Sequence, residues 1–300
     1  MKILLFGKDG QVGWELQRSL SVLGEVVALD RHGRNGLCGD LSDLLGLAAT
    51  VRAVQPSIIV NAAAYTAVDK AESEPELARR INALAPDVLA QEAARLGAWL
   101  VHYSTDYVFD GSGDTPWRET DAPAPLNIYG RSKWEGEQLI QASGCQHLIF
   151  RTSWVYAARG GNFAKTMLRL ARERDELKVI DDQWGAPTGA DLLADITAHA
   201  LRSVAGPVPR PELMGLYHLV AGGQTSWHGY ASYVLAQAKQ SSAAARVVAT
   251  KVTPVPTSAF PTPAQRPHNS RLDTGKLQAA FGLTLPPWHP GVARMLAETL

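Results

Sequence analysis

"KILLFGKDGQVGWELQ", residues 2–17, places an apolar run directly before three glycines and a helical pattern. Gly7, Gly10 and Gly13 follow the spacing Gly-x-x-Gly-x-x-Gly. A strand that turns through glycines into a helix leaves free backbone N–H groups at the helix N-terminus, where a pyrophosphate can bind. Any strand-to-helix turn can use glycines for steric reasons, so the triplet takes its meaning from its context. The stretch predicts the first strand and helix of a dinucleotide-binding fold.

Apolar runs and helical patterns alternate from this stretch as far as Arg151. The predicted strands are "KILLF", "VVALD", "SIIVN", "WLVHY" and "HLIFR", with helices from Trp14, about Leu44, about Glu76 and Lys133. Strands that alternate with helices predict βαβ units. The runs are almost continuously apolar, as expected when helices cover both faces of a sheet. We expect a doubly wound, Rossmann-like α/β fold that binds ligands beyond the C-terminal ends of its strands.

The pattern changes after Arg151, where connections lengthen and helices shorten. We expect a dinucleotide-binding domain over residues 1–155 and a smaller α/β substrate domain over residues 156–300. The proline-rich segment 253–267 is predicted to be an ordered, extended connection. The helix near 191–205 is expected to pack back on the first domain.

Composition excludes several classes of partner. Lys+Arg and Asp+Glu are equal at 29 each, so no basic field attracts nucleic acid or an anionic membrane. Cys38 and Cys145 are too few for a disulfide framework, and no apolar run is long enough to span a bilayer. A cytoplasmic location is therefore expected.

Acidic residues follow the second strand, where a dinucleotide site binds the adenosine ribose. Asp30 is placed to accept the ribose hydroxyls, which favours NADH. Arg31 and His32 could instead meet the 2′-phosphate of NADPH, so both cofactors stay open. Asp40 is placed either to reach the adenine or to cap a helix.

A tyrosine and a lysine in "LNIYGRSKWEGEQ", residues 126–138, lie four positions apart. Tyr129 and Lys133 can therefore face one ligand from a single helix face. The alternative is that Lys133 and Glu137 are an ordinary i,i+4 pair on a solvated helix. Ser104, Thr105 and Asp106 follow the fourth strand. Reduction of a ketone creates an alkoxide that needs a proton, and a phenol near the carbonyl can supply it.

Together these features resemble an extended short-chain dehydrogenase/reductase. More narrowly, the chain is similar to the dTDP-4-dehydrorhamnose reductase family, through "GKDGQVGWEL", "NAAAYTAVDKAE", "YSTDYVFDG", "RTSWVYA", "DQWGAPTGADLLAD" and "RPHNSRL". The resemblance implies NAD(P)H-dependent reduction of the C4 ketone of dTDP-4-dehydro-β-L-rhamnose to dTDP-L-rhamnose. It implies that Tyr129 is the proton donor, that Thr105 modulates it and that Lys133 binds the nicotinamide ribose.

The same resemblance implies further site residues. The implied cofactor-binding residues, beside those already named, are Gln11, Val12, Leu41, Ala63, Ala64, Tyr65, Thr66 and Tyr103. Thr105, Asp106 and Trp154 are implied to contact the sugar nucleotide. Some family members bind Mg²⁺ between subunits of a homodimer, and Glu15, Asp191 and Asp195 match the carboxylates involved. The helix dipole explains acidic residues early in a helix equally well.

Two other functions use the same scaffold. A non-catalytic subunit, like the regulatory subunit of methionine adenosyltransferase, would keep the fold without turnover. A nucleotide-sugar epimerase or 4,6-dehydratase would retain NAD through its cycle, but here Tyr107 follows Asp106 where a dehydratase would be expected to carry another acidic residue.

Overall fold

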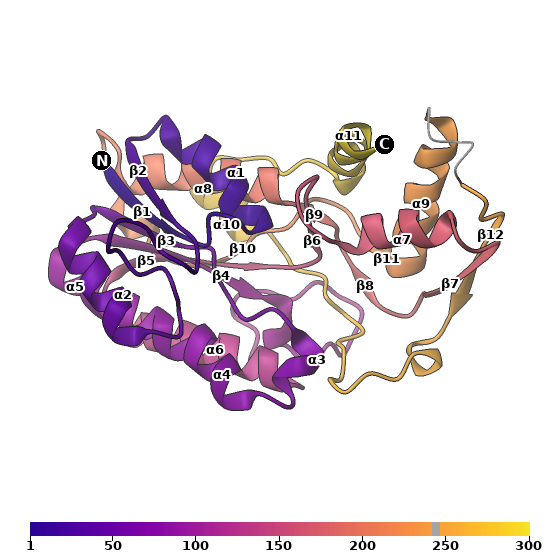
Figure 1. The fold of residues 1–300 in the computed structure, drawn as a ribbon, viewed down its shortest axis with the longest axis horizontal. Helices are drawn as coiled ribbons and strands as arrows, with labels where there is room; N and C mark the ends of the chain where they lie inside the picture. Colours follow the sequence, from indigo (N-terminus) through magenta and orange to yellow (C-terminus); the bar gives the residue numbers. More distant parts are fainter. Residues whose placement is uncertain (242–246) are drawn as a thin grey trace.

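A six-stranded parallel sheet forms the centre of the molecule (Figure 1). The structure is a computed structural model that describes residues 1–241 and 247–300. The sheet order is β10-β5-β4-β3-β1-β2, and all five pairings are parallel. The strands are β1 (Lys2–Phe6), β2 (Glu25–Leu29), β3 (Ile58–Asn61), β4 (Trp99–Thr105), β5 (Gln146–Thr152) and β10 (Gly215–His218). The chain reverses its direction across the sheet between β1 and β3, which is the switch point where such sheets bind ligands.

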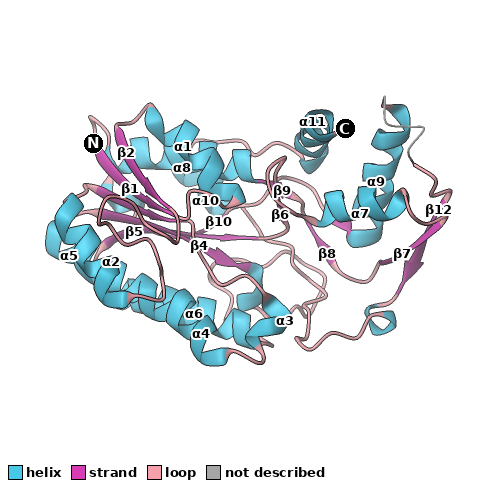
Figure 2. Cartoon of the chain, viewed as in Figure 1, coloured by secondary structure: helices cyan, strands magenta, loops and turns pink. Residues whose placement is uncertain are grey.

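Helices cover both faces of this sheet (Figure 2). One face carries α1 (Gln11–Ser21), α8 (Ala190–Ala205) and α10 (Gly275–Phe281). The other carries α2 (Leu44–Val54), α5 (Ala85–Leu96) and α6 (Ile128–Ala142). Neighbouring strand residues divide between the two layers, since Ile3 packs under α1 and α8 while Leu4 packs under α2 and α5. The predicted doubly wound α/β class is confirmed.

Short helical segments link the main elements on the α6 side. They are α3 (Val68–Ala71), α4 (Pro75–Arg79), a π-helical turn η1 (Arg80–Leu84) that runs into α5, and a 3₁₀ turn η2 (Asp106–Val108) after β4. The helix predicted from about Glu76 is thus three consecutive segments. The helix predicted from Lys133 begins at Ile128, because the Asn127 side chain accepts the Gly130 N–H and caps α6 earlier.

A smaller layered unit lies at the C-terminal ends of the strands, at the right of Figure 1. The elements are β6 (Val155–Tyr156), α7 (Phe163–Ala171), β7 (Glu176–Ile180), β8 (Trp184–Gly185), β9 (Thr188–Gly189), β11 (Thr225–Ser226), α9 (Trp227–Gln240), β12 (Lys251–Val255) and α11 (Trp288–Thr299), with 3₁₀ turns at Pro211–Leu213 and Thr257–Ala259. The core of the unit joins α7, α9 and α11 to β7 and β12.

The second half of the chain also contributes to the main sheet. The edge strand β10 pairs with β5, and α8 packs against α1, where Ser19 donates a hydrogen bond to Asp195 at 2.5 Å. The participation of β10 was not among the sequence predictions. A division between residues 155 and 156 stays a prediction. The proline-rich segment supplies most of β12, which pairs in parallel with β7.

Candidate active site

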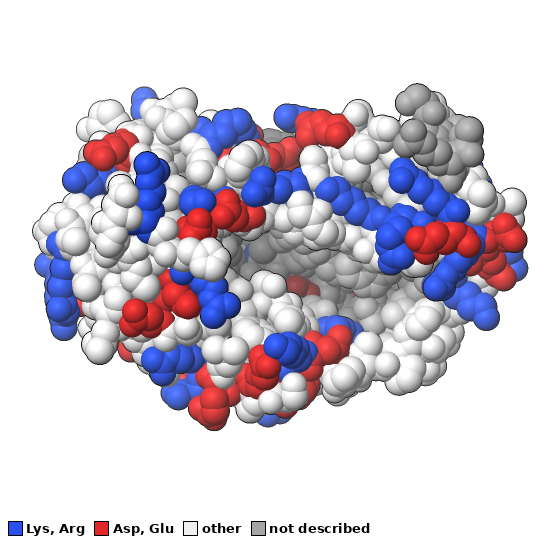
Figure 3. All heavy atoms as spheres, viewed as in Figure 1, with Lys and Arg blue, Asp and Glu red and all other residues white. Residues whose placement is uncertain are grey.

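A cleft of about 760 Å³ lies beyond the C-terminal ends of β1, β3 and β4. Figure 3 shows the molecular surface hollowed at its centre, between the sheet and the smaller unit. Residues between Gly7 and Gly161 line the cleft, and almost all predicted cofactor-binding residues are among them. These are Gly7, Gly10, Gln11, Val12, Asp30, Asp40, Leu41, Ala63, Ala64, Tyr65, Thr66, Tyr103, Tyr129 and Lys133.

The glycine turn forms one wall of this cleft. Gly7 has φ +86°, and a Cβ atom there would lie 2.8 Å from the Ala63 nitrogen. Gly13 lies behind the turn, where a Cβ would come within 2.0 Å of the Gly7 carbonyl oxygen. Both positions therefore require glycine. Gly10 precedes α1, and no side chain in the described part of the chain caps that helix, so its first N–H groups remain open to an anion.

Asp30 follows β2, lines the cleft and is held by two donors. Lys8 Nζ is 2.8 Å from its carboxylate, and the His32 N–H donates to its Oδ1 at 2.8 Å. The hydrogen bond from Lys8 is the main cause that lowers the pKa of Asp30. Lys8 was not predicted, although its place inside the glycine turn is a signal that could have identified it.

Asp40 is close by but does not cap a helix. Its Oδ1 accepts the Ser42 N–H at 2.8 Å and its Oδ2 lies 3.2 Å from Arg31 Nε. The residue that caps α2 is Asp43, which accepts the Gly46 N–H. The helix-cap alternative for Asp40 is therefore wrong, while its side chain does line the cleft.

Tyr129 and Lys133 project from the first turns of α6 into the cleft. Thr105 ends β4, and its hydroxyl lowers the pKa of the neighbouring Tyr129 side chain. Burial is the main cause that raises the pKa of Tyr129 above its ordinary value. The phenol thus keeps its proton, as a proton donor must. The i,i+4 surface pair weighed for Lys133 does not form, because Glu137 is bound to Arg151 at 2.6 Å.

Lys133 is almost fully buried, at 2% exposure. Its Nζ donates to the Tyr103 carbonyl oxygen at 2.5 Å and lies 3.1 Å from His102 Nε2. Burial lowers the pKa of Lys133 to about 8. His102 was not predicted as a site residue, although it stands within the "WLVHY" strand directly before the predicted hydroxyl cluster.

The predicted substrate residues Thr105, Asp106 and Trp154 lie outside the lining of this cleft. Asp106 is 2% exposed, and burial raises its pKa to about 7. Its Oδ1 accepts from Thr105, while its Oδ2 finds no hydrogen-bond partner among the described residues. Trp154 is partly exposed, has φ +49° and stacks on Trp227 with ring centroids 3.5 Å apart.

Two buried hydroxyls in the lining of the cleft also lack a hydrogen-bond partner among the described residues. Ser104 and Thr152 line the cleft from neighbouring strands, and neither Oγ atom has a hydrogen-bond partner within residues 1–241 and 247–300. Buried polar atoms are normally satisfied, so such a pair fits a place where a polar ligand binds. Their positions at the ends of two parallel strands could have indicated them from the sequence.

The predicted metal residues do not assemble into one cluster. Glu15 and Asp191 line a small cavity of about 30 Å³ together with Arg294, whose guanidinium lies 3.9 Å from Asp191. Asp195 is instead bound by Ser19 and Arg18. In the described part of the chain no group of three His, Cys, Asp or Glu residues could hold a metal ion. One copy of the chain therefore does not supply the predicted Mg²⁺ site.

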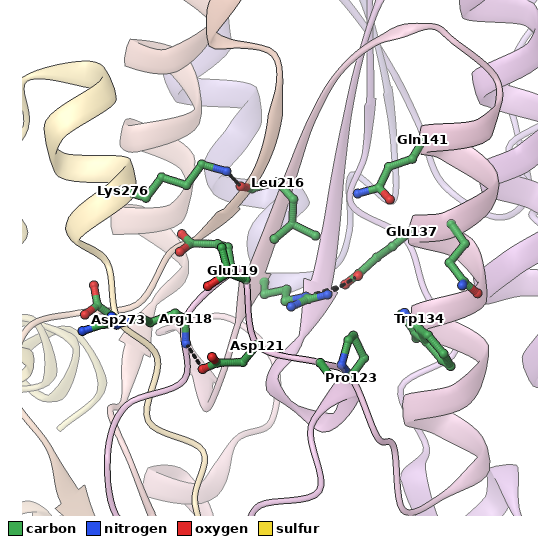
Figure 4. Close-up of a pocket in the computed structure, with 14 residues that line it drawn as sticks. Arg118, Glu119, Asp121, Pro123, Trp134, Glu137, Gln141, Leu216, Asp273 and Lys276 are labelled. Carbon is green, nitrogen blue, oxygen red and sulfur yellow. Dashed lines mark hydrogen bonds and ion pairs between the residues drawn. The ribbon is translucent and has the colours of Figure 1, made fainter.

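A second cavity, of about 890 Å³, lies at the β10 edge of the sheet. Figure 4 shows Glu137, Trp134 and Gln141 extending from α6 toward it, with Lys276 opposite. It shares no lining residue with the cofactor cleft. The bound Glu137 and Arg151 side chains line it.

Comparison with known proteins identifies the family of this chain. The family model of the RmlD substrate binding domain matches residues 1–300. The dTDP-4-dehydrorhamnose reductase of Shigella flexneri is 60% identical over 298 residues, which cover 99% of this chain and 98% of that protein. This chain belongs to the dTDP-4-dehydrorhamnose reductase family. The resemblance inferred from the sequence is thereby confirmed.

Solved structures of this family have the same fold. The dTDP-4-dehydrorhamnose reductase of Clostridium acetobutylicum superimposes with a TM-score of 0.88 at 35% identity, over 99% of both chains. That of Bacillus anthracis, solved in complex with NADP, gives a TM-score of 0.88 at 34% identity, again over 99% of both chains. No helix in the described residues is long and apolar enough to cross a membrane.

Proposed function

We propose that this chain reduces the C4 ketone of dTDP-4-dehydro-β-L-rhamnose to dTDP-L-rhamnose with NAD(P)H, the final step in making this activated sugar. The observation that carries the proposal is that Tyr129 and Lys133 line the same cleft as the glycine turn and Asp30. Full-length relatives that are dTDP-4-dehydrorhamnose reductases support the substrate.

The cofactor supplies the hydride, and the glycine-turn side of the cleft fits its nucleotide. The open N-terminus of α1 would hold the pyrophosphate, and Asp30 would accept the ribose hydroxyls. Lys8 and Arg31 flank Asp30 and would meet a 2′-phosphate. The cleft therefore has groups for either NADH or NADPH, and both remain in the proposal.

Tyr129 would donate its proton to the C4 oxygen as the alkoxide develops. Thr105, whose hydroxyl lowers the pKa of Tyr129, would orient the phenol, and Lys133 would hold the nicotinamide ribose hydroxyls. Asp106, with its pKa of about 7, is suited to binding a sugar hydroxyl either as donor or as acceptor. Trp154 would cover the sugar from the smaller unit.

An absorbance assay tests this function. Purified protein, NADPH or NADH, and enzymatically prepared dTDP-4-dehydro-β-L-rhamnose should give substrate-dependent oxidation of the reduced nicotinamide and dTDP-L-rhamnose as product. No oxidation by folded protein that still binds cofactor would refute the reductase and favour a regulatory subunit. NAD retained through purification and through turnover would favour an epimerase or dehydratase.

The homodimer and its Mg²⁺ belong to the same proposal. Glu15 and Asp191 share their cavity with the cationic Arg294, and one chain's described residues offer no complete group of metal ligands. The other ligands of the Mg²⁺ ion would therefore have to come from a second copy. Light scattering with and without EDTA checks this, and a monomer at all magnesium concentrations would contradict it. The cytoplasmic location stays a prediction.

A further inference from the structure

His102 is an ionisable side chain that the reaction above does not use. It lies on β4 at 1% exposure, directly behind the cleft. Its Nε2 is 3.1 Å from Lys133 Nζ, and its Nδ1 is 3.2 Å from the amide nitrogen of Asn61 at the end of β3. Asn61 is also 1% exposed. The three side chains form a buried row that ends at the predicted ribose-binding lysine.

The backbone decides which way the Asn61 amide points. Asn61 Oδ1 accepts the N–H of Ala63 at 3.2 Å. A backbone N–H can only donate, so the oxygen must occupy that place and the amide nitrogen must face His102. His102 Nδ1 is therefore an acceptor and carries no proton.

The tautomer of His102 follows from this orientation. Burial holds the pKa of His102 well below its ordinary value, so the ring is neutral and carries a single proton. That proton is on Nε2, which points at Lys133 Nζ. An ammonium has only donors to offer to an N–H, whereas an amine offers a lone pair. The arrangement therefore disfavours the charged form of Lys133.

No other charged group around Lys133, among the described residues, offsets the effect of the His102 Nε2–H on the charged form of Lys133. Glu137, one turn later on α6, raises the pKa of Lys133, but Arg151 from β5 binds both of its oxygens at 2.9 and 2.6 Å. On β4 the neighbours are His102 and the Tyr103 backbone. The adjoining η1 turn presents the neutral Asn82, which bonds Ser132 of α6. On η2 the ionisable groups are Asp106 and Tyr107, and both act electrostatically on Tyr129 of α6.

We infer that Asn61 and His102 are positioning residues that set the pH at which Lys133 loses its positive charge, and with it the alkaline limit of catalysis. This inference rests on the proposed reductase function. Asn61 acts by fixing the imidazole tautomer, and His102 acts by presenting Nε2–H to Lys133. Neither residue needs to touch the substrate or the cofactor.

The variant Asn61→Asp exchanges the donor and acceptor roles of the two His102 nitrogens, with little change in side-chain volume. One carboxylate oxygen still accepts the Ala63 N–H, and the other now requires a proton on His102 Nδ1. His102 Nε2 then becomes an acceptor for the Lys133 ammonium. We expect the alkaline limb of kcat/KM to move up by about one pH unit or more, as for a group that gains a favourable partner. In a His102→Phe background the tautomer route is absent, so adding Asn61→Asp there should displace the limb, relative to His102→Phe alone, by much less than in the wild-type background.

Two measurements test the inference independently of substrate turnover. In ¹⁵N-histidine NMR spectra, wild-type His102 should show the Nε2–H tautomer and Asn61→Asp should show Nδ1–H. His147, whose Nδ1 faces the Cys145 carbonyl oxygen at 2.9 Å, provides an Nδ1–H reference that His147→Gln assigns. Titration of ¹³C-labelled lysine, with Lys133→Met for assignment, should show the same upward displacement for Lys133 as the activity profile.

The outcomes separate this inference from the proposed function. An Nδ1–H tautomer for His102 in the wild-type protein would overturn the inference even if the reductase is active. An equal displacement by Asn61→Asp in the wild-type and in the His102→Phe background would also overturn it, because direct attraction by the new carboxylate would then be the cause. A protein without reductase activity but with the expected tautomers and Lys133 titration would refute the proposed function alone.

Discussion

Burial of Lys133 is expected to cost the folded protein stability, and Lys133→Met should recover part of it. The pKa of Lys133 falls from 10.5 to about 8 on folding because its ammonium is removed from water. One pH unit of pKa difference corresponds to about 1.4 kcal/mol, so the buried charge costs about 3 kcal/mol of unfolding free energy. Methionine has a similar length and carries no charge to bury.

The sign and the pH range follow from the two pKa values. Below about pH 8, Lys133 is protonated in both the folded and the unfolded chain, and the full cost of burying its charge applies. Between about pH 8 and 10.5 only the unfolded chain keeps this proton, so the free energy of unfolding rises with pH. Methionine forfeits the hydrogen bonds that the neutral amine of Lys133 makes with Tyr103 and His102, each worth about 1 kcal/mol. Lys133→Met should therefore be about 1 kcal/mol more stable than wild type near pH 7 and less stable by about 2 kcal/mol above pH 10.5.

Urea unfolding followed by circular dichroism, from about pH 7 to about pH 10, measures this difference. Comparison with wild type at each pH cancels the titration of all other groups. Lys178→Met, at an exposed position on β7, is the control and should follow the wild-type pH dependence. Parallel curves for wild type and Lys133→Met across this range would show that burial does not depress the pKa of Lys133.

Three further substitutions test separate parts of the site. Tyr129→Phe should lower kcat by about 10²–10⁴ with cofactor affinity nearly unchanged, and full turnover in this variant would eliminate Tyr129 as the proton donor. Arg31→Ala should weaken NADPH binding about tenfold more than NADH binding in fluorescence titrations if its exposed guanidinium meets the 2′-phosphate; equal losses would contradict that contact. Glu137→Gln leaves the Arg151 charge buried with one acceptor fewer, so chemical denaturation should show a loss of about 3 kcal/mol, and an unchanged midpoint would mean that the pair contributes nothing.

The fold class was predicted from local sequence patterns, and the structure confirms it. The apolar run before Gly7 and the continuous apolar strands require cover on both faces, which is a property of residue order alone. Gly7 and Gly13 were identified by spacing, and their backbone contacts explain why no other residue fits. The start of α6 was placed too late because the capping role of Asn127, whose side chain accepts the Gly130 N–H, was not recognised in the sequence.

The sequence by itself determined the chemical inventory of the site: the glycine turn, Asp30, Thr105, Tyr129 and Lys133 all stand in recognisable local patterns. Only the tertiary structure decided which groups meet across the sheet. Asn61, His102 and Lys133 come from three elements and are brought together by strand register and by the packing of α6 on β4. Likewise, Asp195 binds Ser19 rather than joining Glu15 and Asp191. Contacts between side chains far apart in the chain depend on how helices dock, which local patterns do not specify.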